Sequence, residues 1–143
     1  MLAKQSALAA TAQKEIVTKR GHRFNDKLTL PIIVEDSFGK IEKTKEVLKS
    51  LEKIGVIDDI IRSKEGTHIR AGKGKRRGRR YKTPKSVLII SPENAIKKGS
   101  KNINGIDVVT PEMLNIEHLA PGGDEGRLTI ITKSALNTLG GTN

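Results

Sequence analysis

The sequence predicts an α/β fold: a mostly parallel sheet with covering helices, layered as in a Rossmann fold, plus a long basic loop. Three mostly apolar runs, at 87–90, 106–109 and 128–131, are typical of strands that are covered on both faces. Helical segments separate these runs, and that alternation implies parallel strands joined by right-handed crossovers. The length, 143 residues, fits a single α/β domain spanning 1–143.

The N-terminal segment 1–27 is predicted to be a basic helical arm. Residues 2–19 contain no Pro or Gly and are rich in Ala, Lys and Gln, which favour helix. Gly21 is expected to end this helix. The expected apolar stripe of this helix comprises Leu8, Ala12 and Ile16.

The segment after the arm predicts one short strand and two helices. The strand lies at 30–34, where Pro31 favours a strand start or a sheet edge. The first helix presents an apolar face and ends at Gly55, and the second runs from about Val56 to Glu65. The apolar face of the first helix comprises Val47, Leu48, Leu51 and Ile54.

Short helices are predicted to follow the three buried strands. The middle one begins at Thr110, with Thr as cap and Pro111 in the first turn. The three helices are expected at 92–98, from Thr110 to the Pro121-Gly122-Gly123 stretch, and at 133–139.

The positive charge is concentrated in one place. The chain has 27 Lys and Arg against 16 Asp and Glu, a net charge of +11. Segment 70–85 has nine basic and no acidic residues, and segment 1–27 has six basic and two acidic. The two larger segments, 28–69 and 86–143, each carry one net negative charge. This distribution is typical of a protein that binds a polyanion.

Segment 70–85, inserted before the strand at 87–90, is predicted to be an RNA-binding loop. Arg side chains form bidentate hydrogen bonds to phosphate oxygens, and glycines let the backbone approach the phosphates closely. Tyr81 is the expected stacking residue for an unpaired base. A solvated loop or a nuclear-import patch is the alternative. The expected phosphate contacts are Arg70, Lys73, Lys75, Arg76, Arg77, Arg79, Arg80, Lys82 and Lys85, with a second contact at Arg20, His22 and Arg23.

Several other classes find no support in the sequence. Without cysteine there is no disulfide, thiolate zinc site or cysteine nucleophile. No metal-ligand spacing or phosphate loop is present, so no metal or other cofactor and no small-molecule substrate is expected. No apolar run reaches the ~18 residues of a membrane helix, and no signal sequence is evident, which predicts a cytoplasmic protein.

Two acidic pairs and one loop have alternative interpretations. Glu35-Asp36 follows a strand and could hold a metal, and Asp58-Asp59 is a second carboxylate pair. We favour a loop and a helix start, where acids interact with the helix dipole. Segment 120–127 is interpreted as a connector between a helix and a strand.

Five stretches, taken together, resemble the archaeal and eukaryotic form of the fourth large-subunit ribosomal protein family. They occur in the family's order and cover about 2–139. The stretches lie at 6–12, 20–24, 43–46, 69–88 and 115–123.

The resemblance implies a structural protein of the large ribosomal subunit. It implies an α/β body that binds ribosomal RNA early in assembly and contacts neighbouring subunit proteins, with no enzymatic activity and no cofactor. Family members are longer at the N-terminus and send a loop toward the exit tunnel, so a tunnel role is not carried over. An RNA-binding regulator outside the ribosome is an alternative. An RNA-acting enzyme on the same fold is another, but it would need clustered acids or a cofactor loop.

Overall fold

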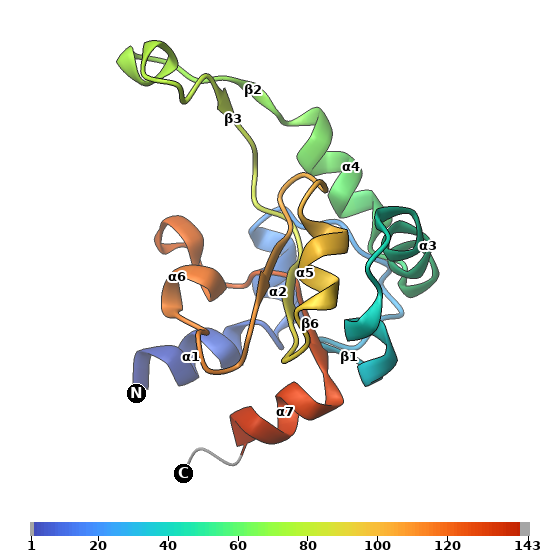
Figure 1. Ribbon diagram of the computed structural model, residues 1–143. Helices are drawn as coiled ribbons and strands as arrows, with labels where there is room; N and C mark the ends of the chain where they lie inside the picture. Colours follow the sequence, from blue (N-terminus) through green and yellow to red (C-terminus); the bar gives the residue numbers. More distant parts are fainter. Residues whose placement is uncertain (1, 141–143) are drawn as a thin grey trace.

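A four-stranded parallel sheet forms the centre of the molecule, as the computed structural model shows for residues 2–140 (Figure 1). The strand order is β1-β6-β4-β5, and every neighbouring pair is parallel. This arrangement confirms the predicted fold class and the parallel pairing of the three buried strands. The strands are β1 (Ile32–Val34), β4 (Leu88–Ile90), β5 (Asp107–Val109) and β6 (Thr129–Thr132).

The two central strands supply both faces of the core because successive side chains point to opposite sides of a sheet. Ile89 lies opposite Ile130, and both join the larger apolar cluster. Leu88, Ile90 and Ile131 belong to the second cluster. All five side chains are buried. This double burial explains why β4, Leu-Ile-Ile, has no polar residue and why β6, Thr-Ile-Ile-Thr, does not alternate between apolar and polar residues.

Helices cover both faces of the sheet. The larger cluster includes Val17, Leu51 and Ile96, so α2, α3, α4 and α5 lie over one face. The second cluster includes Ala7 and Ala135, which places α1, α6 and α7 over the other. The helices are α1 (Leu2–Ala10), α2 (Lys14–Lys19), α3 (Thr44–Ile54), α4 (Ile57–Glu65), α5 (Ala95–Ser100), α6 (Ile116–Leu119) and α7 (Lys133–Gly140).

The prediction of one helix over 2–19 is wrong, because the segment forms α1 and α2 with a break at Thr11. The buried Thr11 hydroxyl donates a hydrogen bond to the carbonyl oxygen of Leu8 at 2.6 Å. This side-chain bond competes with helix continuation. The break also disrupts the predicted stripe: Ala12 is exposed, whereas Leu8 still packs against the second core cluster and Ile16 is half-buried. The buried residues of this segment are Ala7, Ala10, Thr11 and Val17.

The predicted helix from Thr110 is also wrong. Residues near Thr110 form a turn, in which the Met113 N–H donates to the Thr110 carbonyl at 3.1 Å. The single-turn α6 begins only after Asn115, which caps it in a reciprocal box with His118. The Asn115 N–H donates to His118 Nδ1 at 3.2 Å, and this cap fixes the helix start at Asn115 rather than at Thr110. The helix predicted at 92–98 likewise starts later, at Ala95.

The elements between β1 and the basic segment confirm the prediction. The edge strand β1 begins just after Pro31. Helix α3 ends at Gly55, whose φ of 88° is the left-handed conformation that glycine adopts without strain. Helix α4 then runs to Glu65. Residues 2–140 also contain three short 3-10 helices: η1 (Asp36–Lys40), η2 (Lys73–Arg76) and η3 (Pro121–Gly123).

Candidate nucleic-acid interface

The basic segment forms a hairpin that projects from the body (Figure 1). Its arms are β2 (His68–Ile69) and β3 (Tyr81–Lys82), which pair antiparallel with Ile69 opposite Tyr81. The Arg70 N–H donates to the Arg80 carbonyl at 2.7 Å, which continues the ladder toward the tip. Helix η2 lies at the tip. The sequence predicted a loop here, and the hairpin pairing was not evident from it.

The hairpin presents seven exposed cations. Among the residues that the structure describes, none of the seven takes part in an ion pair. Because segment 70–85 contains no acid, their charges are not neutralised along the hairpin itself. The seven are Lys73, Lys75, Arg76, Arg77, Arg79, Arg80 and Lys82.

Two further members of the predicted set have partners within the chain. The half-buried Arg70 donates from Nε to the Arg79 carbonyl at 3.2 Å, which ties one arm to the other. Lys85 Nζ lies 2.8 Å from Asp107 Oδ2. Tyr81 is 60% exposed, and the guanidinium of Arg80 lies 5.9 Å from its ring centre. The Tyr81 ring therefore offers a face to solvent.

Asp59 holds the root of the hairpin from inside the protein. Its buried carboxylate accepts hydrogen bonds from Ser86 Oγ at 2.7 Å and Arg62 Nε at 2.9 Å, and lies 2.9 Å from His22 Nδ1. The Arg23 backbone N–H donates at 3.0 Å to Oδ1, the oxygen that also accepts from Arg62. Burial opposes the charged form, but the contacts from His22, Arg62 and Ser86 outweigh it and lower the pKa of Asp59 to about 2.

Helix α4 fixes both arms of the hairpin. The first arm follows α4 directly in the chain, and the second returns beside it. Arg62 Nη2 donates to the Lys85 carbonyl at 2.9 Å, and Ser63 Oγ donates to the Pro84 carbonyl at 2.7 Å. With the bond from Ser86 to Asp59, these contacts set the direction in which the hairpin leaves the body.

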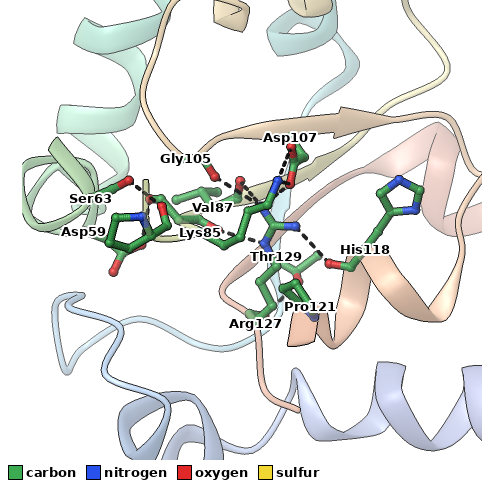
Figure 2. A network of polar contacts seen from close by, with 12 residues as sticks. Asp59, Ser63, Lys85, Val87, Gly105, Asp107, His118, Pro121, Arg127 and Thr129 are labelled. Carbon is green, nitrogen blue, oxygen red and sulfur yellow. Dashed lines mark hydrogen bonds and ion pairs between the residues drawn. The ribbon is translucent and has the colours of Figure 1, made fainter. Parts of the chain in front are cut away.

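Arg127 forms a second buried network at the same root (Figure 2). Its guanidinium donates to the carbonyls of Ser86 at 2.8 Å, His118 at 2.9 Å and Gly105 at 3.2 Å. Its Nη2 also lies 2.7 Å from Asp107 Oδ2. The guanidinium thus connects the start of β4, the end of α6 and the loop before β5.

Burial and charge shift the pKa values within this network. Burial lowers the pKa of Arg127, and the neighbouring Asp107 carboxylate partly offsets that effect. Burial would raise the pKa of Asp107, but the hydrogen bond from Lys85 and the charge of Arg127 lower it below its usual value. The interpretation of 120–127 as a mere connector therefore missed a central residue. One signal was available: Arg127 directly precedes the mostly apolar run at 128–131.

The structure separates the three N-terminal residues predicted to contact RNA. Only Arg23 has an exposed side chain. The His22 ring is buried against Asp59, and its Nε2 has no hydrogen-bond partner among the described residues. The half-buried Arg20 donates to the carbonyls of Pro121, at 2.9 Å, and of Asp124. Arg20 and His22 thus already have hydrogen-bond partners within the fold.

A groove brings some of these residues together at the hairpin root. It has a volume of about 420 Å³, and Arg20, Arg62, Lys82 and Lys85 contribute to its walls. Arg23 does not line it. The predicted cations thus form two sets: those at the root of the hairpin and those that project with its tip.

The acidic pairs occupy the predicted positions, but Asp59 differs in role. Asp58 and Asp59 lie in the first turn of α4, yet the Asp59 carboxylate points into the core. Asp36 Oδ1 accepts hydrogen bonds from the backbone N–H and the hydroxyl of Ser134 near the start of α7. Within the described part of the chain, no three His, Asp or Glu side chains are grouped to hold a metal. Nor does any helix there have the length and apolarity to span a membrane.

The fold and the site define a class: a parallel α/β body from which a firmly anchored polycationic hairpin projects. The profile of the "Ribosomal protein L4/L1 family" matches residues 1–142, and the chain belongs to this family.

Archaeal relatives support the same assignment. The chain is 53% identical over 138 residues to a Thermoplasma acidophilum protein named "Large ribosomal subunit protein uL4", covering 96% of this chain and 54% of the relative. A protein of that name from Methanocaldococcus jannaschii is 54% identical over 137 residues, covering 94% and 54%. The one from Aeropyrum pernix is 49% identical over 141 residues, covering 96% and 52%. The chain spans about half the length of these relatives.

Proposed function

We propose that this chain is a ribosomal RNA-binding structural component of the large ribosomal subunit. The observation that carries the proposal is the hairpin with its seven exposed, unpaired cations. Family membership and the names of the relatives support the ribosomal setting. A structural role in the cytoplasmic ribosome, with neighbouring subunit proteins as partners and no catalysis, is part of the proposal.

The proposed mechanism is counterion release by a preorganised hairpin. Cations that reach phosphates displace condensed counterions, and this gain does not depend on RNA sequence. The anchored root also sets the position and orientation of the protein on the RNA, because the phosphate contacts come from a rigid element. Tyr81 contributes by stacking on an unpaired base. Arg70 and Lys85 contribute less than the seven, since each already has a partner.

The revised contact set also includes Arg23 but leaves out His22. The Arg23 side chain is exposed near the root, whereas His22 is committed to Asp59. Arg20 can still add its charge to the root groove, although its N–H groups already bond to backbone carbonyls.

An RNA-binding regulator outside the ribosome could use the same hairpin. The two candidates differ in where the cellular protein is found. Sedimentation of a cell extract should place the chain with large subunits, and it should remain there at a salt concentration that removes loosely bound proteins. Recovery mainly in the light fractions, with RNA binding by the purified chain intact, would favour the regulator.

An RNA-acting enzyme on the same fold has no specific observation in its favour. The acid that follows β1, Asp36, accepts two hydrogen bonds from Ser134, a structural use of its carboxylate. The proposal therefore assigns RNA binding, and not catalysis, to this molecule.

A further inference from the structure

Strand β5 forms one border of the sheet and pairs only with β4 among the described residues. Asp107 donates its N–H to the Val87 carbonyl at 3.3 Å, and Val109 accepts from the Ser91 N–H at 3.1 Å. In a parallel ladder, alternate residues direct their N–H and C=O groups to the same neighbour. The N–H and C=O of Val108, between them, therefore point away from β4 and toward the open border.

A groove of about 590 Å³ runs along this border. Its floor includes Ile106 and Val108, both half-buried, which pack from outside against the larger core cluster. Helix α5 and the residue that follows it provide one wall, with the exposed side chains of Lys97, Lys98 and Lys101. An apolar floor, a free strand edge and a cationic wall thus lie side by side.

The groove carries net positive charge. Asp107 is the one carboxylate among its described lining residues, and it already lies 2.7 Å from Arg127 Nη2 and 2.8 Å from Lys85 Nζ. Lys98 Nζ lies 3.7 Å from Glu42 in an exposed pair, which is worth little. The charges of Lys97 and Lys101 have no such partner in the described part of the chain.

We propose that this border binds an extended acidic segment of a partner protein, which adds to the sheet as a strand beside β5. The partner backbone would bond to the outward N–H and C=O of Val108, because strand addition gains its affinity from main-chain hydrogen bonds. Successive side chains of a strand point to opposite faces, and Ile106, Val108 and α5 share one face. The glutamates of the partner would therefore lie on that face, with their methylene groups over Ile106 and Val108 and their carboxylates near Lys97 and Lys101. An RNA strand could meet the lysines but has no backbone amide for Val108, so the geometry favours a peptide.

This surface lies on α5 and β5 and contains none of the seven exposed cations of the hairpin, so the inference goes beyond the proposed RNA-binding function. The probe is a short capped peptide that alternates glutamate and valine, titrated into the isotopically labelled full chain. We expect saturable binding and slower amide exchange at Val108 by about tenfold or more, since its N–H gains a partner. The Asp107 amide, already bonded to β4, should change little. Saturable binding without protection at Val108 would overturn the strand-addition geometry.

Variants test the charge requirement. Lys97→Glu with Lys101→Glu should weaken the peptide by about tenfold, since each exposed pair contributes only modestly. Arg76→Glu with Arg77→Glu in the hairpin is the matched control and should leave peptide affinity unchanged while weakening an oligouridylate RNA. The proposal is overturned if the α5 variant, folded by thermal melt, binds the peptide normally. It is equally overturned if that variant loses the RNA rather than the peptide, because the surface would then be an RNA contact.

Discussion

At the scale of single residues, two buried charged groups organise the molecule. Asp59 is fully buried and accepts from His22, Arg62 and Ser86, and Arg127 is fully buried among carbonyl oxygens. Sequence reasoning placed Asp59 at a helix start but could not foresee its burial. Whether a carboxylate points to solvent or to the core depends on which elements pack against that turn, and a local pattern does not contain that information.

Removing the Asp59 carboxylate should be strongly destabilising. Asp59→Ala leaves buried hydrogen-bond donors without their acceptor, and breaking a buried pair in this way costs about 3–5 kcal/mol. Asp58→Ala is the matched control, because Asp58 is the exposed neighbour on the same helical turn and should change stability by less than about 0.5 kcal/mol. Denaturant unfolding measures both. Similar losses in the two variants would show that the network does not support the root.

The lowered pKa of Asp59 predicts an acid-sensitive component of stability. The pKa falls from an ordinary 3.8 to about 2 in the folded protein. A depressed carboxyl pKa stabilises the fold above pH 3.8, and this contribution is lost as the pH falls toward about 2. The pKa difference corresponds to about 2 kcal/mol.

The free energy of unfolding, followed by urea titration across that pH range, checks this prediction. Asp59→Asn should lose less stability than the native chain between the two pH limits. A parallel loss in both proteins would assign the acid sensitivity to other carboxylates, such as Asp36 or Asp107, whose pKa values are also lowered.

At the scale of secondary-structure elements, local sequence signals predicted a helix or strand correctly wherever tertiary contacts did not override them. Helix α3 has an apolar face and a terminal Gly55, and both features appear in the structure as expected. The long helix over 2–19 failed because a buried Thr11 hydroxyl bonds to the backbone. The helix after β5 starts late because Asn115 is the better cap. Both errors concern where a helix starts or breaks, which side-chain caps decide.

The hairpin root should be intolerant of added volume at Gly105. A Cβ there would lie 2.6 Å from the Pro84 carbonyl oxygen and 2.9 Å from the Ser86 nitrogen, both backbone atoms. Gly122 is the matched control, since its φ of 82° resembles the 77° of Gly105 but no atom lies within 4 Å of its Cβ position. The conformational strain is therefore common to both variants.

Gly105→Ala should lower the free energy of unfolding by about 1–3 kcal/mol more than Gly122→Ala does, the usual cost of overpacking. Thermal and denaturant unfolding of the two variants give the difference directly. Equal destabilisation would mean that the root accommodates the methyl group and that the second arm of the hairpin is not tightly held there.

Tyr81 on β3 should affect RNA binding without affecting its salt dependence. Its ring is exposed, and stacking on a base contributes about 1–3 kcal/mol irrespective of counterions. Tyr81→Ala should therefore weaken binding at every salt concentration by the same factor. Tyr81→Phe, which keeps the ring, is the control and should bind like the native chain. A reduced salt slope in Tyr81→Ala would indicate that the substitution displaces the neighbouring cations instead.

At the scale of the whole molecule, folding and the proposed RNA binding belong to different parts: the body contains the core, and the hairpin contains the exposed cations. The core clusters lie entirely outside segment 70–85, and the exposed unpaired cations of the hairpin lie entirely within it. Composition predicted this division, because the charge excess of the segment is visible in the sequence. Composition could not show that two buried networks, centred on Asp59 and Arg127, hold the hairpin in one direction. Those contacts join residues far apart in the chain.

The salt dependence of RNA binding tests the central claim most directly. If the seven exposed cations reach phosphates, log affinity against log salt should have a slope of about −5 to −6, at about 0.7–0.9 per contact. Replacing four of them should flatten the slope by about three units and weaken binding to every RNA tested. That variant changes Arg76, Arg77, Arg79 and Arg80 to Ala.

A control variant removes the same number of charges from the body, by Ala substitution of the exposed Lys45, Lys49, Lys53 and Lys133. The measurement is a salt titration of binding to a large-subunit ribosomal RNA fragment, with thermal melts to verify folding. The account predicts a slope that falls in the hairpin variant and stays unchanged in the control. An unchanged slope in a folded hairpin variant would contradict it and would place the RNA contact elsewhere on the molecule.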